Sequence, residues 1–179
     1  ADTNDTIGQD QTSSLVGRVT VLPVSTSDGI VHVGVAAARM DPAAATSANL
    51  SDANRWRMRA RPESHVNRGR FIDTGQVKNV DHASLYGLEA AATWKSLSFQ
   101  SEYNRETLRR TSSDLIEPTY DGYYAFVSWF PTGDRRPYDR TEGSFGRVVP
   151  KSSKGALELA VRYSTMDLND AEAGVLGGK

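Results

Sequence analysis

The chain has 179 residues, with 21 basic and 22 acidic side chains and a formal net charge of −1 at pH 7. This near balance provides no global field that would favour nucleic acid or an anionic membrane surface as a partner. The absence of cysteine excludes disulfides, thiolate metal sites and cysteine nucleophiles. No apolar run approaches the roughly 18 residues of a membrane-spanning helix, but a spanning β-strand needs only about 9–11 alternating residues.

Residues 1–13 are polar and aperiodic, which predicts a loop or a disordered segment. Two alternating stretches, residues 14–24 and 30–39, predict strands on either side of the turn Ser27-Asp28-Gly29. A polar, alanine-rich loop at residues 40–53 follows them.

Four arginines then occupy every second position, at Arg55, Arg57, Arg59 and Arg61. On a strand all four would share one side, and Trp56, Met58 and Ala60 would share the other. Like charges spaced about 7 Å apart repel one another, so the pattern favours an anionic cargo. The alternative is an edge strand whose charges discourage aggregation.

Further strands are predicted at residues 70–77, 84–94, 97–104, 119–130 and 155–164, with a charged loop at 105–117. In residues 84–94 one face reads Tyr86, Leu88, Ala90, Ala92 and Trp94, an apolar band with an aromatic residue at each end. That arrangement is typical of a strand that crosses a bilayer. About eight antiparallel strands result, and a soluble β-sandwich, whose strands also alternate, stays open as the alternative fold.

Enzyme signatures are weak. His32, His65 and His82 are far apart in sequence and lack metal-ligand spacing. Asp73-Thr74-Gly75 resembles the aspartic-protease triplet but has no second copy, so we interpret it as a turn. We therefore expect neither catalysis nor a cofactor.

Six ordered motifs resemble the phosphate-selective porin O and P family. They are residues 59–63 (RARPE), 71–75 (FIDTG), 86–90 (YGLEA), 128–134 (SWFPTGD), 136–138 (RPY) and 145–150 (FGRVVP). The resemblance implies an all-β, antiparallel transmembrane β-barrel of 16 strands, usually trimeric, in the outer membrane of a Gram-negative bacterium. The implied partners are phosphate, polyphosphate or other small anions and outer-membrane lipid, without nucleic acid.

A family member is roughly twice as long as this chain. We therefore interpret residues 14–166 as a middle portion with about eight strands of the barrel, and residues 167–179 as a loop at which the chain is truncated. The resemblance also implies a lumen-facing arginine ladder, which maps onto Arg55, Arg57, Arg59 and Arg61. The full expected anion-binding and pore-lining set is Arg55, Arg57, Arg59, Arg61, Arg68, Arg70, Arg140, Arg147, Lys151 and Arg162.

The connection at residues 131–153 is too long for a simple turn and carries five cationic residues. We expect it to fold inward and narrow the periplasmic side of the pore; the alternative is a disordered periplasmic loop. For the chain as a whole, the alternative function is a soluble β-sandwich module that binds anionic polymers such as heparin or polyphosphate.

Overall fold

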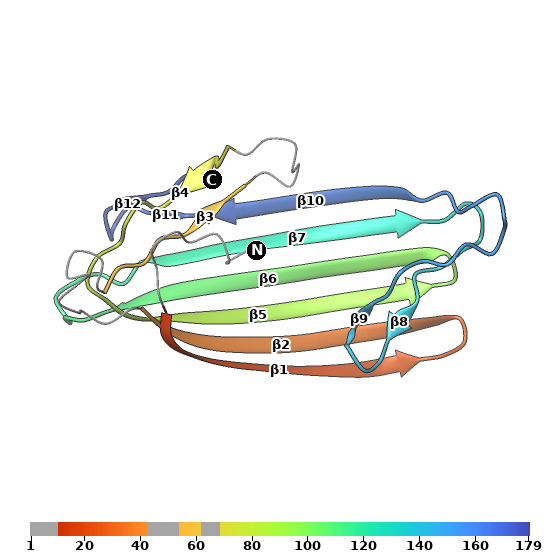
Figure 1. Ribbon diagram of the computed structural model, residues 1–179, viewed down its shortest axis with the longest axis horizontal. Coiled ribbons are helices and arrows are strands. Elements are labelled where there is room, and N and C mark those ends of the chain that lie inside the picture. The colour runs from red at the N-terminus through yellow and green to blue at the C-terminus, as the bar shows by residue number, and fades with distance from the viewer. Residues whose placement is uncertain (1–10, 43–53, 62–68) are drawn as a thin grey trace.

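The computed structural model describes residues 11–42, 54–61 and 69–179, and the statements below concern these residues. They form one six-stranded antiparallel sheet in the order β1-β2-β5-β6-β7-β10, with three two-stranded hairpins beside it (Figure 1). The long strands are β1 (Gln11–Ser25), β2 (Gly29–Pro42), β5 (Val80–Trp94), β6 (Leu97–Arg110), β7 (Thr119–Trp129) and β10 (Leu159–Asp167). No helix in these ranges is long and apolar enough to cross a membrane.

Each long strand pairs with the next long strand along the chain, so the sheet is a meander. The connections at one end are short between β1 and β2 and between β5 and β6, where Lys95 takes a positive φ of 52°. At the other end, residues 43–79 join β2 to β5 and residues 111–118 join β6 to β7. Two of the three connections at the first end are thus short turns, like the periplasmic turns of outer-membrane barrels, whereas the third, residues 130–158 between β7 and β10, is long.

The register places a row of exposed apolar residues from each of the six strands on one face of the sheet. Trp94, Leu97, Trp129 and Leu159 are aligned at the short-turn end, and Tyr103 pairs with Tyr123 six residues further along β6. Six residue steps of a strand span about 20 Å. This face is exposed, with Leu88 at 56% and Val161 at 75% of their full accessibility. The further exposed members are Leu15, Val19, Val21, Val33, Val35, Tyr86, Phe99, Val127 and Tyr163.

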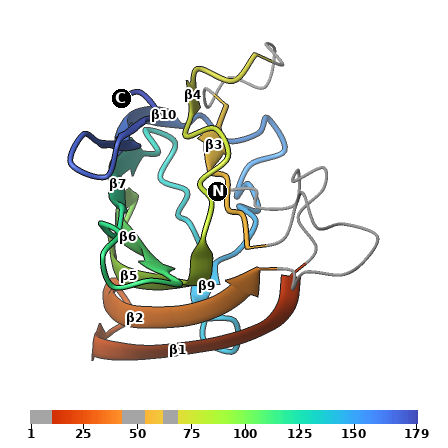
Figure 2. The same cartoon turned by 90° about the vertical axis from the view of Figure 1, so that its left-hand side faces the viewer.

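The sheet is strongly curved, and two of the small hairpins lie on its concave side (Figure 2). One is formed by β3 (Arg59–Ala60) and β4 (Ile72–Asp73), and the other by β8 (Tyr138–Asp139) and β9 (Ser144–Phe145). The third hairpin, β11 (Asn169–Asp170) with β12 (Val175–Leu176), follows β10. The exposed apolar face is therefore the convex one, as lipid contact requires.

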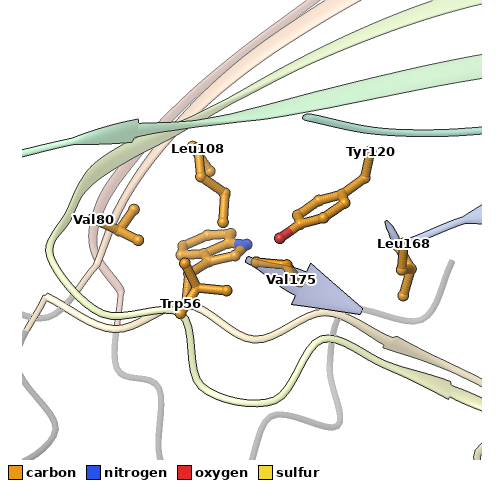
Figure 3. Packing of buried hydrophobic residues seen from close by; sticks show 8 residues of the cluster. Trp56, Val80, Leu108, Tyr120, Leu168 and Val175 are labelled. Carbon is orange, nitrogen blue, oxygen red and sulfur yellow. The ribbon is translucent and has the colours of Figure 1, made fainter. Parts of the chain in front are cut away.

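The buried core lies at the long-loop end, between the sheet and the segment that leads into β3. Trp56, which packs with Leu108 and Tyr120 (Figure 3), forms an isolated bridge with Val77, and the side chains of Trp56 and Val77 are both buried. The cluster is completed by Val80, Ala83, Leu108, Tyr120, Leu168 and Val175. Met58 and Ile72 are packed against it. The core therefore attaches an inner segment of chain to the concave face rather than joining two sheets.

Several predicted boundaries were wrong. Residues 55–61 do not form a long strand: only Arg59 and Ala60 are in one, and it is outside the six-stranded sheet. The short strand expected at 70–77 is reduced to Ile72–Asp73. The charged loop expected from residue 105 starts after Arg110, because residues 105–107 continue the pairing with β7. Residues 169–176 hold a hairpin instead of a plain loop, and residues 1–10 are outside the described part of the chain.

Candidate anion pathway on the concave face

The arginine-bearing segment runs along the concave side of the sheet at its long-loop end (Figure 2). Trp56 is held there by the bridge to Val77, with Trp56 N donating 2.8 Å to Val77 O and Val77 N donating 2.8 Å to Trp56 O. Thr74 N donates to Met58 O over 2.9 Å. These backbone hydrogen bonds, together with the burial of Trp56, fix the segment against the internal core. The apolar partner of Trp56 is this core, and not lipid.

Arg57 is bound bidentately by Asp73 of β4. Its Nε lies 2.7 Å from Asp73 Oδ1 and its Nη2 lies 2.5 Å from Oδ2. The hydrogen bonds from Arg57, together with one from Gly75 N, hold the pKa of the Asp73 carboxyl below its usual range. One of the four ladder arginines is thus part of an ion pair that stabilises the β3–β4 hairpin, and an anion at Arg57 would have to compete with Asp73.

The other members of the expected set are distributed over both ends of the sheet. Arg55, Arg59 and Arg70 are partly buried, Arg61 is exposed, and Arg68 is outside the described residues. The Arg162 guanidinium of β10 stacks 3.7 Å over the Tyr124 ring on the concave face. Arg140 Nη2 donates to Ser25 Oγ over 2.5 Å, near the β1–β2 turn. Arg147 and Lys151 are exposed.

The long connection after β7 folds onto the concave face, as expected for residues 131–153. His32 of β2 lies against Tyr138, with ring centroids 5.6 Å apart, and Arg135 Nη1 donates to Ser27 O over 2.7 Å. The base of the connection is closed by buried Asp134, which accepts hydrogen bonds from Thr132 Oγ1 at 2.6 Å and from Lys151 N at 2.7 Å. These contacts order the connection and speak against the alternative of a disordered loop.

Arg136, a residue of this connection that the expected pore-lining set did not include, lies against the concave face of the sheet. Arg136 lies with its guanidinium carbon 5.0 Å from the centre of the Phe126 ring and 5.7 Å from that of Phe145. Its Nε is 3.5 Å from Glu158 Oε1. Arg162, the cross-strand partner of Phe126, stacks on Tyr124, so two guanidinium groups lie over two successive inward-facing rings of β7. The alternation of β7 could have indicated that Phe126 faces inward.

Two segments that carry cationic residues therefore lie on the concave side of the sheet, the arginine-bearing segment at the long-loop end and the β8–β9 hairpin at the short-turn end (Figure 1). The convex face carries an exposed apolar surface flanked by aromatic residues. A model of the family described as "Phosphate-selective porin O and P" matches residues 1–179. The chain belongs to this family.

Two relatives match parts of the chain. An uncharacterised protein of Caulobacter vibrioides is 38% identical over 128 residues, which cover 69% of this chain and 24% of the relative. Porin O of Pseudomonas aeruginosa is 31% identical over 88 residues, which cover 49% of this chain and 20% of that protein. The matched parts of this chain thus span about a quarter and a fifth of these relatives.

The family assignment confirms the resemblance recognised in the sequence and the transmembrane β-barrel class, and it places this porin in the outer membrane of a Gram-negative bacterium. The exposure of the convex face contradicts the β-sandwich alternative, because a sandwich would bury Leu88 and Val161 between two sheets. The six strands form an open sheet.

Proposed function

We propose that the whole protein is a passive channel that carries phosphate, polyphosphate or other small anions across the outer membrane, and that it acts as a homotrimer without enzymatic activity. The observation that carries the proposal is the segregation of the two faces: cationic segments line the concave face, and the convex face is apolar and exposed.

Guanidinium groups suit this task because they stay protonated and offer a planar fork of donors that matches phosphate oxygens. Cationic side chains spaced along a pore can each bind an anion strongly enough to admit it and weakly enough to release it to the next. In the proposed pathway an anion meets Arg55, Arg59, Arg61 and Arg70 at the extracellular end. It then passes Arg162 on the wall and Arg140, Arg147 and Lys151 at the periplasmic hairpin; Arg68 belongs to the same proposed set. Arg57 contributes mainly through its pair with Asp73.

The test is phosphate block of chloride current in planar bilayers with the full-length protein. Replacing Arg57 and Arg59 with Ala should weaken the block, because two cationic groups leave the pathway and the Asp73 carboxylate loses its partner. The matched control replaces Arg105 and Arg109, whose positions in β6 face the convex side, with Ala and removes the same charge. An equal phosphate affinity in both double variants and the parent would count against the pathway.

A further inference from the structure

An acidic residue stands on the concave face among the cationic groups. Glu89 of β5 faces inward, where an unpaired carboxylate would repel an anion. Its two oxygens are bound by Arg18 of β1, at 2.8 Å from Nε to Oε1 and 3.0 Å from Nη2 to Oε2. His32 Nε2 lies 3.4 Å from Oε1. The carboxylate is therefore engaged by two partners from two other strands.

The Glu89 side chain reaches Arg18 by crossing over β2, at the position of Gly34. Gly34 pairs with Thr20 of β1 on one side and with Glu89 on the other. A Cβ on Gly34 would lie 2.1 Å from Glu89 Oε1, so any other residue would displace the carboxylate. The lack of a side chain at Gly34 thus leaves the space in which the Glu89–Arg18 ion pair forms.

Both partners of Glu89 also hold the β8–β9 hairpin. Arg18 donates from Nη2 to Gly143 O over 3.0 Å and from Nη1 to Glu142 O over 3.3 Å, at the tip of the hairpin. His32 Nδ1 lies 2.5 Å from the Tyr138 hydroxyl at its start. Gly143 has a φ of 61°, and a Cβ at this position would lie 3.3 Å from Thr20 Oγ1, so glycine suits the tip.

We propose that Glu89 is a positioning residue that fixes the β8–β9 hairpin to the wall by orienting Arg18 and His32. The carboxylate holds the Arg18 fork in the one orientation in which its outer nitrogens meet the two carbonyls of the tip. The hairpin then stands in the pore as a fixed element, and Glu89 acts on the anion path through hairpin position rather than by contact with the anion.

The experiment uses the full-length protein with a spin label on Cys introduced at exposed Thr141; the present chain contains no cysteine. Glu89→Gln and Arg18→Gln change the net charge in opposite directions, but both remove the Arg18–Glu89 ion pair. Both should therefore add a mobile component to the electron paramagnetic resonance spectrum of the label. Glu102→Gln is the matched control, because Glu102 is the cross-strand partner of Glu89 and accepts its hydrogen bond from Tyr124 of β7. It should keep the parent spectrum.

Gly34→Ala is the second variant, since it displaces Glu89 without changing any charge and should also mobilise the label. Heat-modifiable migration in gels establishes that each barrel is folded. A label that stays as immobile in Glu89→Gln and Gly34→Ala as in Glu102→Gln would overturn the proposal, as would mobility in Arg18→Gln alone. Anion current through each variant, measured in planar bilayers, tests the proposed channel, whereas the mobility of the label does not depend on it. If the label is equally immobile in all variants while the protein still carries anion current, only the positioning role of Glu89 is rejected. If the label behaves as expected but the protein carries no anion current, only the proposed channel is rejected.

Discussion

The indole of Trp56 donates a hydrogen bond of 2.6 Å to Glu106 Oε1, and both side chains are buried. Trp56 belongs to the inner segment and Glu106 to the wall strand β6, so this bond joins the arginine-bearing segment to the sheet. A buried carboxyl requires such a donor, because an unsatisfied polar group in the core costs about 1–3 kcal/mol.

Trp56→Phe should therefore destabilise the folded barrel by about 1–3 kcal/mol, since most of the ring is retained but the Glu106 oxygen loses its donor. Glu106→Gln is the matched variant, because its amide oxygen can still accept the hydrogen bond from the indole. Its free energy of unfolding should fall by less than that of Trp56→Phe. Urea unfolding of the refolded protein in detergent gives both values. A Trp56→Phe loss that is as large in a Glu106→Leu background as in the parent would indicate that ring packing, and not the hydrogen bond, dominates at this site.

The Asp73–Arg57 pair predicts an acid-sensitive arginine segment. The folded-state pKa of Asp73 is lowered, chiefly by the Arg57 hydrogen bonds, so the pair stabilises the fold above the unfolded-state pKa of about 3.9. That stability is lost as the pH falls through the lower, folded-state value. A spin label on Cys introduced at exposed Arg61 should become mobile once the pH falls below this lowered pKa, which lies under the ordinary value of about 3.9.

In the same experiment Asp73→Asn should show a mobile label already at neutral pH, because the amide cannot form the charged pair. A spectrum that is insensitive to acid in the parent, or unchanged by Asp73→Asn, would show that the Trp56 cluster alone holds the segment.

The two faces of the sheet could be predicted from the sequence, whereas the inner segment could not. On β5 and β6 each residue's face follows from alternation alone, so the outward placement of Tyr86, Leu88 and Phe99 was predictable. The segment around Trp56 alternates equally well, but its partner is Val77 and a core assembled from four other strands. No local pattern distinguishes that core from lipid.

Contacts between distant residues explain most of what the sequence did not reveal about the candidate site. Arg18 and Glu89 are 71 residues apart, and Arg18 and Gly143 are 125 residues apart. The inward folding of residues 131–153 was predicted from their length and charge together with the family resemblance, but its anchors, Arg18 and His32, had no distinguishing pattern. Arg57 looked like its neighbours in the arginine series until Asp73 was placed beside it.

Adjacent residues on β6 test the assignment of the two faces. Phe99→Arg places a charge on the convex face, where a charge near the bilayer midplane costs about 2–4 kcal/mol, and should impair assembly. Gln100→Arg, one residue away and inward-facing, should assemble normally. The yield of heat-modifiable barrel after refolding measures both. Impaired assembly of the two variants to the same degree would contradict the assignment of lipid and lumen faces.

Removing the inward hairpin tests its place in the proposed pore. Deletion of residues 139–147 takes away β9 and the cations Arg140 and Arg147, so single-channel conductance should rise and anion preference should fall. The matched control keeps the hairpin and replaces only Arg140 and Arg147 with Ala. It should reduce anion preference, measured as the zero-current potential in a salt gradient, with a smaller change in conductance.

The comparison separates the two ways in which the hairpin can act. A rise in conductance confined to the deletion assigns a steric role to the backbone that Arg18 and His32 hold against the wall. Equal effects of deletion and double substitution assign the role to charge. Conductance and selectivity that stay at parent values in both variants, in barrels that still fold, would show that residues 139–147 neither narrow nor line the conduction path.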